Sequence, residues 1–227
     1  MIELYNMKPT IISIIGAPGV GKSFLSEKLA KQLGAKIILE VGQGLPDRIV
    51  ENFKKNIRQV ETILWFRNKF IENIEQANLL KQKGEIVVMD GCLITNELHI
   101  TTMTSGFKQE ILLEQAGFDR KYIPNPDIII FLDASEEKIK ELTLMRGRDF
   151  DTNESFIRRN LSIRRAHQEY YEKNKNSLIY INRDNLDFVK EDDLLKVVEK
   201  IEASVRWLLK TICRASKSRP FGDFLIG

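Results

Sequence analysis

A glycine-rich segment with one lysine has the composition of a phosphate-binding loop. Residues 16–23 follow an apolar run and precede a segment with helical spacing at 24–33, which is the context that the P-loop pattern requires. Backbone N–H groups in such a loop, together with the N-terminus of the next helix, favour a bound anion. Lys22 is expected to reach the outer phosphates, and Ser23 to ligate Mg²⁺. The residues expected to hold a nucleotide here are Gly16, Ala17, Pro18, Gly19, Val20, Gly21, Lys22, Ser23 and Phe24.

Three carboxylates stand where apolar, strand-like runs end: Glu40, Asp90 and Asp133. Ligands of open α/β sheets bind at the carboxyl ends of the strands. Glu40 is therefore expected to act as a general base toward an acceptor hydroxyl, and Asp90 to coordinate or support Mg²⁺. Capping of the following helix is the alternative for each carboxylate. For Asp133, which Ala-Ser-Glu-Glu follows, a helix start is favoured.

A second basic cluster surrounds Gly147. Arg146 and Arg148 flank this glycine after a segment of helical character at 136–144. Arginines on a closing segment neutralise the charge of transferring phosphates. Residues at about 144–154 are therefore expected to form a lid with two catalytic arginines, and a solvated basic turn is the alternative. ATP phosphate binding and a solvated helix face are equally open for the next arginines, Arg158, Arg159, Arg164 and Arg165.

Five short runs rich in Ile, Val, Leu and Phe alternate with longer segments of helical spacing. Continuous apolar runs are typical of strands buried on both faces of a parallel sheet. Alternation of such strands with helices predicts an α/β fold, a doubly wound parallel sheet with helices on both faces. The strand-like runs are 11–15, 36–41, 85–89, 127–132 and 178–181.

The composition is that of an ordinary globular protein. The 227 residues are 43% hydrophobic and 30% charged, with 13 Gly and 6 Pro, which excludes predominantly disordered and collagen-like chains. A net charge of +3 gives no argument for nucleic-acid binding. No run reaches the ~18–20 apolar residues of a membrane span, and no signal peptide is recognised. The two cysteines, Cys92 and Cys213, lie far apart in the chain, which favours a reducing compartment and a cytoplasmic location.

In the type and order of these motifs, the chain resembles the deoxynucleoside kinases, within the thymidylate-kinase-like P-loop kinases, from about residue 11 to about residue 201. Glu40 matches the catalytic base of that family, and Asp90 the first position of its acidic-Arg-Ser motif. Residues 180–182 look like the last strand, and Asp187 and Phe188 look like the loop that holds the adenine of ATP. The lid pattern is matched by Arg146, Arg148 and Asp151.

The resemblance implies a five-stranded parallel sheet of P-loop nucleotide kinase type, ATP and Mg²⁺ as cofactors, and a homodimer. It also implies transfer to the 5′-hydroxyl of a deoxynucleoside, a small-molecule substrate, with Asp151 on the sugar 3′-hydroxyl. The kinase domain is expected over 1–205, followed by a basic amphipathic helix and apolar tail over 206–227. The acceptor is expected to contact Glu40, Phe53, Val60, Glu61, Arg67, Asn96 and Asp151.

Several positions depart from the family pattern, and all of them concern the acceptor. The acidic-Arg-Ser motif is degenerate, because Gly91 stands in place of its arginine. Asn96 stands where the family often has an acidic residue that reads the base. Val60 stands in place of a glutamine, and Phe53 is the nearest counterpart of the sugar-side tyrosine. The phosphate-binding residues are retained.

A deoxynucleoside kinase or a close relative with an altered acceptor site is therefore expected. The first alternative is a nucleoside monophosphate kinase of the same fold, which needs a further basic site for the phosphate of its acceptor. The residues that could provide this site are Arg48, Arg58 and Arg67. The second alternative is a catalytically impaired, nucleotide-binding subunit. Gly91 favours it, whereas Lys22, Glu40 and the lid arginines argue against it.

Overall fold

The strands form a single parallel sheet. The computed structural model describes residues 8–42, 44–147 and 154–217, the last thirteen of these by their backbone only. Within these residues the sheet has the strand order β2-β3-β1-β4-β5, and all neighbouring strands pair in parallel. The prediction of a five-stranded parallel sheet is confirmed. The strands are β1 (Ile11–Ile15), β2 (Lys36–Ile38), β3 (Val87–Asp90), β4 (Ile128–Asp133) and β5 (Ile179–Asn182).

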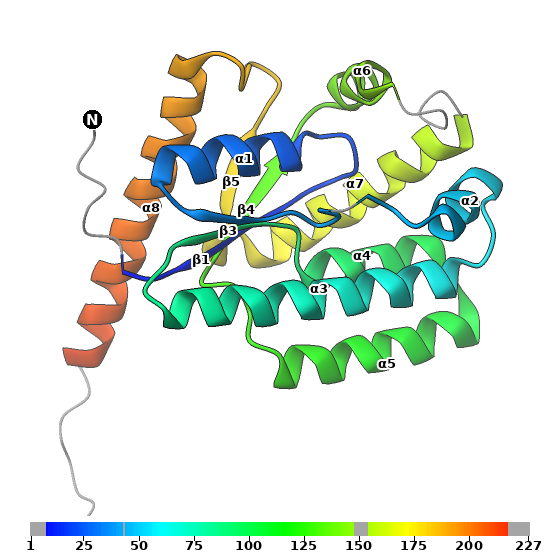
Figure 1. The fold of residues 1–227 in the computed structure, drawn as a ribbon, viewed down its shortest axis with the longest axis horizontal. Helices are drawn as coiled ribbons and strands as arrows, with labels where there is room; N and C mark the ends of the chain where they lie inside the picture. Colours follow the sequence, from blue (N-terminus) through cyan, green and yellow to red (C-terminus); the bar gives the residue numbers. More distant parts are fainter. Residues whose placement is uncertain (1–7, 43, 148–153, 218–227) are drawn as a thin grey trace, which may run out of the picture.

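Helices cover both faces of this sheet, as expected (Figure 1). On one side lie α1 and α8, on the other α3, α4 and α7, and α5 forms an outer layer beside α3 (Figure 1). The helices are α1 (Lys22–Leu33), α2 (Asp47–Lys55), α3 (Gln59–Gln82), α4 (Leu93–Met103), α5 (Gly106–Tyr122), α6 (Glu136–Arg146), α7 (Glu154–Asn174) and α8 (Glu191–Lys217), with a 3₁₀ turn at Lys175–Ser177.

The continuous apolar run of β1 reflects burial on both faces. Ile12 and Ile14 pack into a cluster with residues of α1 and α8, while Ile11 packs against α3. Ile15 packs with residues of α4 and α7. Because successive strand side chains point to opposite faces, both sets of positions must be apolar. The carboxyl end of β1 is thereby anchored where the glycine-rich loop begins.

Asp133 contacts α7 instead of starting a helix. The N-cap of α6 is Ser135, whose hydroxyl accepts the backbone N–H of Lys138 at 3.2 Å. The buried Asp133 carboxylate instead accepts Nε of Arg164 at 3.0 Å and Nε2 of Gln168 at 3.0 Å. The helix start expected of Asp133 is thus provided two residues later, and Asp133 joins β4 to α7.

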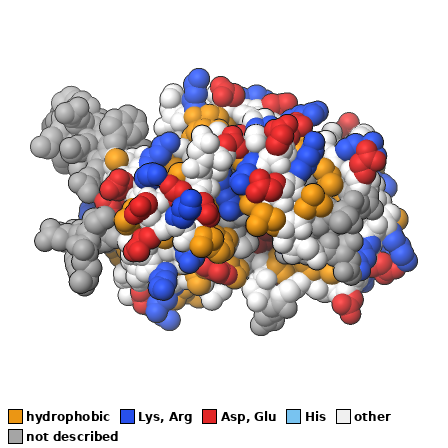
Figure 2. Space-filling view, turned by 90° about the horizontal axis from the view of Figure 1, so that it is seen from above, with side chains coloured by type: hydrophobic (Ala, Val, Ile, Leu, Met, Phe, Trp, Pro, Cys, Tyr) orange, Lys and Arg blue, Asp and Glu red, His pale blue; other side chains and the backbone are white. Residues whose placement is uncertain are grey.

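The last helix crosses the boundary expected at 205/206, since α8 is continuous from Glu191 to Lys217. Its first half contributes Leu194, Val197 and Ile201 to the core, and residues 218–227 lie outside the described part. Of the helices described, none is long and apolar enough to cross a membrane. Acidic and basic side chains are interspersed over the face of the molecule shown in Figure 2.

Candidate active site

The glycine-rich loop joins β1 to α1 and lies against the ends of neighbouring strands. Gly21, the N-cap of α1, has a φ of 96°, in the left-handed region that favours glycine. A Cβ on Gly16 would collide with the backbone carbonyl of Leu132 in β4. The loop glycines therefore allow both the turn and the close approach to β4. The Lys22 side chain is 8% exposed, and its Nζ donates to the carbonyl oxygen of Ala17 at 3.3 Å.

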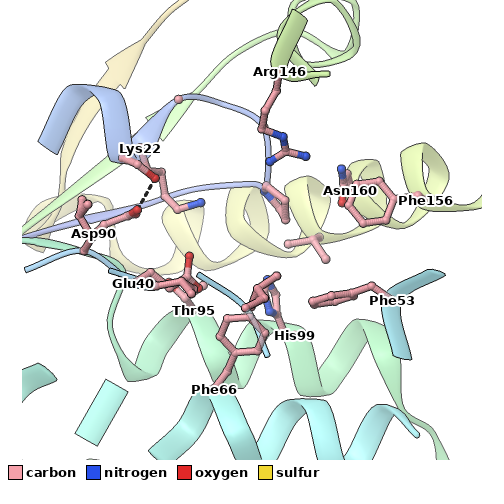
Figure 3. A pocket seen from close by; sticks show the side chains of 18 of the residues that line it. Lys22, Glu40, Phe53, Phe66, Asp90, Thr95, His99, Arg146, Phe156 and Asn160 are labelled. Carbon is pink, nitrogen blue, oxygen red and sulfur yellow. Dashed lines mark hydrogen bonds between the residues drawn. The ribbon is translucent and has the colours of Figure 1, made fainter. Parts of the chain in front are cut away.

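Ser23, in the first turn of α1, and Asp90, the last residue of β3, are adjacent. The Ser23 hydroxyl donates to Oδ2 of Asp90 at 2.5 Å (Figure 3). Asp90 is buried, and its Oδ1 has no hydrogen-bond partner among the described residues. Mg²⁺ favours hard oxygen ligands and is usually held by one or two protein groups together with water and substrate phosphates. A hydroxyl beside a carboxylate with one unused oxygen fits this donor set.

No group of three or more His, Cys, Asp and Glu in the described residues could hold a metal ion. Bound at Ser23 and Asp90, Mg²⁺ would neutralise charge on the phosphates of the nucleotide.

A cavity of about 770 Å³ opens beside the P-loop. In Figure 3, Lys22, Glu40 and Asp90 lie at one end of this cavity, and Phe53, Phe156 and Asn160 lie at the other. This is a usual volume for a small-molecule site. The expected site residues that line it are Pro18, Gly19, Gly21, Lys22, Ser23, Phe24, Glu40, Phe53, Asp90 and Arg146.

The remaining loop residues support this wall without lining it. Ala17 and Val20 are buried in the core beside α1, and Gly16 contacts β4. Arg148 and Asp151 lie outside the described residues. The lid expected at about 144–154 is described only to Gly147, the C-cap of α6, which has a φ of 70°. Arg146, the last residue of α6, reaches the cavity.

The structure does not bring Arg67 to the cavity. Its Nε donates to Oδ2 of Asp119 at 2.5 Å, and its Nη2 donates to Oδ1 at 2.6 Å. This two-point contact joins α3 to α5, and it raises the pKa of Arg67 through the hydrogen bonds to the carboxylate. In this structure Arg67 therefore holds α3 and α5 together and does not contact the cavity.

Val60 and Glu61, on the first turn of α3, also lie away from the cavity lining. Val60 packs against a cluster that includes Ile100 of α4 and Leu112 of α5. Glu61 forms an ion pair with Arg48 and accepts a hydrogen bond from the Asn52 amide at 3.3 Å. Two of the three arginines considered for an acceptor phosphate, Arg48 and Arg67, are thus paired with carboxylates.

Asn96 and Gly91 show how α4 departs from the expected pattern. Asn96 is 4% exposed and does not line the cavity, whereas Thr95 and His99, one helical turn apart, do. Gly91 has a φ of 81°, and a Cβ there would lie 2.8 Å from Cε1 of Phe70. Phe70 is itself buried. An arginine at position 91 would therefore require both backbone strain and displacement of Phe70.

Arg183, which follows β5, connects the P-loop to the loop expected to hold adenine. Its Nη1 donates to the carbonyl oxygen of Val20 at 2.6 Å, and its Cζ lies 4.6 Å from the centroid of the Phe188 ring. A Cβ on Gly21 would collide with this guanidinium. Arg183 lines the cavity, whereas Phe188 is buried in the core and Asp187 contacts Asp193 and Val189 through its backbone and side chain.

Only one of the four arginines of α7 lines the cavity. Arg158 pairs with Glu154, Arg164 with Asp133 and Arg165 with Glu136. Arg159 lies in the cavity wall with its neighbours on the same helical face, Phe156, Asn160 and Ile163. The spacing of these four residues repeats with the period of a helix, and that signal in the sequence could have identified the face. Phe66 of α3 also lines the cavity.

His99 is uncharged at neutral pH. Burial, with contributions from His167, Lys22 and Arg159, lowers its pKa to about 3. Its Nε2 is buried and has no hydrogen-bond partner in the described part of the chain. A neutral imidazole nitrogen can donate or accept a hydrogen bond according to its tautomer. His99 is thus a hydrogen-bonding group of the cavity wall.

Comparison with known proteins identifies the family. A sequence model described as an AAA domain matches residues 11–187. The chain belongs to this AAA-domain family. The matched range of the AAA domain begins at β1 and ends in the loop after β5, and so contains every described residue of the cavity.

The chain is also similar to a nucleoside kinase and to a nucleotide kinase. It is 28% identical to the deoxyadenosine/deoxycytidine kinase of Bacillus subtilis (strain 168) over 164 residues, 68% of this chain and 74% of that protein. It is 25% identical to the adenylate kinase of Thermococcus onnurineus (strain NA1) over 87% of this chain and 97% of that protein.

The fold agrees with this similarity. A deoxyadenosine kinase structure from M. mycoides superposes with a TM-score of 0.68 at 17% identity, covering 85% of this chain and 99% of that one. The AAA domain therefore has the P-loop fold of nucleoside and nucleotide kinases, as the resemblance implied.

Proposed function

We propose that this protein transfers the γ-phosphoryl group of ATP to the 5′-hydroxyl of a deoxynucleoside. The observation that carries the proposal is one cavity with two chemically different ends. The P-loop end carries Lys22, Ser23 and Asp90, and the other end carries the rings of Phe53, Phe66 and Phe156. Phosphates favour the first environment, and a planar base favours the second.

The position of Glu40, in the same cavity as Lys22 and Asp90, supports a role for it in catalysis. It follows β2 at the carboxyl edge of the sheet. A carboxylate in this place can accept the proton of an attacking hydroxyl. The cation of Lys22 and the guanidinium of Arg146 can stabilise charge on the transferring group, and such preorganised contacts supply most of the catalysis in phosphoryl transfer.

A nucleoside acceptor is favoured over a nucleoside monophosphate. The phosphate that a monophosphate acceptor carries needs its own cations. Two of the three arginines considered for that role, Arg48 and Arg67, are paired with Glu61 and Asp119. The deoxynucleosides in the name of the Bacillus subtilis relative support the same acceptor class. The adenylate kinase relative keeps the monophosphate as the alternative to be tested.

The test is a screen of acceptors with γ-labelled ATP and Mg²⁺. Each deoxynucleoside is compared with its own 5′-monophosphate at equal concentration, and the labelled product is identified by chromatography. The proposal predicts labelled monophosphates from nucleosides. Labelled diphosphates formed only from monophosphates would support the alternative, and ATP hydrolysis without transfer to any acceptor would contradict both.

A further inference from the structure

At the end of the cavity far from the P-loop, an arginine of the described chain is held against aromatic rings. The guanidinium carbon of Arg159 lies 4.9 Å from the ring centroid of Phe53 and 4.7 Å from that of Phe156. The two rings meet edge to face, with centroids 6.5 Å apart. Phe53 comes from α2 and Phe156 from α7, so the cation is positioned by two separate elements.

The polar atoms at this end include unpaired donors. Nη2 of Arg159 and Nδ2 of Asn160 are buried and have no hydrogen-bond partner within the described chain. A buried donor left unpaired is costly, and a ligand that accepts its hydrogen bond removes the cost. Oγ1 of Thr95, which lies beside Glu40 in Figure 3, and Nε2 of His99 are unpaired as well, and these two groups can donate or accept.

The same end has donors but no carboxylate. Among the described residues of the cavity wall, the only carboxylates are Glu40 and Asp90, and both lie near Lys22 (Figure 3). Arginine has donors only, whereas an exocyclic amino group of a base needs an acceptor. Burial lowers the pKa of Arg159 to about 10, so the group keeps its charge at neutral pH.

Resting on the proposed function, we propose that Arg159 determines acceptor specificity by selecting a base with an exocyclic oxygen over its analogue with an amino group. The oxygen accepts from the guanidinium at the aromatic end, while the hydroxyl to be phosphorylated lies near Glu40. In this orientation a phosphate on the acceptor would lie at the P-loop end, opposite the rings that hold Arg159. Deoxyadenosine and deoxycytidine, named for one relative, both carry amino groups, so this chain is expected to differ in base preference.

Two matched pairs of nucleosides test this specificity. Deoxyuridine and deoxycytidine differ in an oxo or amino group on the pyrimidine, and deoxyinosine and deoxyadenosine differ in the same way on the purine. Binding to the full chain is measured by calorimetry with Mg²⁺ and a non-hydrolysable ATP analogue. In at least one pair, the oxo member is expected to bind about tenfold more tightly, the usual size of a hydrogen bond to a charged donor.

Arg159→Met keeps an unbranched apolar stem against the rings and removes every donor. In this variant the affinities for the oxo and amino members of a pair are expected to differ by about twofold or less, since the hydrogen bond is lost. Arg158→Met is the matched control, because Arg158 is the neighbouring arginine, is exposed and pairs only at 3.7 Å with Glu154. Its variant should keep the wild-type preference.

Equal binding of both members of both pairs by the wild-type protein would overturn the inference, and so would an unchanged preference in Arg159→Met. Absence of binding by all four nucleosides would overturn it too. The wild-type comparison is decisive even if the variant fails to fold. Because binding requires no transfer, a preference in calorimetry without labelled product contradicts the proposed function alone, and transfer without preference contradicts the inference alone.

Discussion

Ser23 donates its hydroxyl hydrogen to Oδ2 of Asp90 at 2.5 Å, and Oδ1 of the same carboxylate is buried without a partner among the described residues. Asp90 ends β3, and Ser23 lies in the first turn of α1, which the glycine-rich loop joins to β1. The strands β1 and β3 pair directly, with Ile14 opposite Asp90. The sheet register therefore places a P-loop hydroxyl beside a carboxylate more than sixty residues away.

We expect Asp90→Asn to raise the Mg²⁺ concentration at which phosphoryl transfer reaches half of its maximal rate. A hard cation prefers anionic oxygen, and loss of one supporting group in a metal site costs about 10–100-fold in metal affinity. The measurement is a Mg²⁺ titration of phosphoryl transfer at saturating ATP. If the titration midpoint shifts in Glu40→Gln and stays in place in Asp90→Asn, the assignment of the two carboxylates is reversed.

Glu40→Gln is expected to lower kcat by about 10²–10⁴ and to leave the KM for ATP within about twofold, because the amide cannot accept a proton. Steady-state kinetics with varied ATP and varied acceptor separate the two quantities. A glutamine variant with wild-type kcat would remove Glu40 from the role of general base.

Arg67 is expected to stabilise the fold and not to bind the acceptor. Arg67→Met leaves the Asp119 carboxylate, whose side chain is 7% exposed, without its charged partner. The free energy of unfolding should fall by about 1–3 kcal/mol, measured by urea denaturation, with acceptor KM unchanged. Lys69→Met is the control on the same helix, since its pair with Glu72 is exposed and should contribute about 0.5 kcal/mol or less. A raised acceptor KM with unchanged stability would place Arg67 in the acceptor site.

His167 should make the protein less stable in acid. Its side chain is 1% exposed, Nδ1 donates to the Ile163 carbonyl at 2.8 Å, and burial lowers its pKa from 6.5 to about 4. The unfolded chain therefore binds the proton more readily between about pH 6.5 and pH 4, and stability falls as the pH falls through this range. Between pH 7.5 and pH 5 the loss from His167 is about 2 kcal/mol.

His167→Asn keeps a donor for the Ile163 carbonyl and removes the titrating group. Urea denaturation at both pH values should show a smaller difference in this variant than in the wild-type protein, by about that amount. An equal difference in the two proteins would show that His167 is not the group responsible.

Local sequence signals predicted the sheet and the phosphate loop. The apolar run of β1 and the glycine spacing of 16–21 depend on neighbours in sequence, so both could be inferred from the chain. The aromatic end of the site could not be inferred in this way, because Phe53 and Arg159 are brought together only by the packing of α2 and α7. In the sequence, Arg159 is one of several helix arginines, and its solvated neighbour Arg158 has the same residue type.

On the acceptor side, matching residues to the family pattern by their position in the sequence assigned some side chains to the wrong place. Arg67 and Asn96 occupy positions that the family resemblance assigns to the acceptor, yet Arg67 contacts Asp119, and Asn96 does not line the cavity. The face of α4 toward the cavity carries Thr95 and His99 instead. Which side of a helix meets the cavity depends on its rotation, and that is set by tertiary packing.

The most direct test of a phosphoryl-transfer site at the P-loop is label transfer from γ-labelled ATP to the best acceptor of the screen, in the wild-type protein, Lys22→Ala and Lys31→Ala. Lys31 lies in the last turn of the same helix and is exposed. We predict a rate lower by about 10²–10⁴ in Lys22→Ala, because a charged contact to the transferring phosphate is lost, and an unchanged rate in Lys31→Ala. Wild-type label transfer by correctly folded Lys22→Ala would contradict a phosphoryl-transfer site at the P-loop.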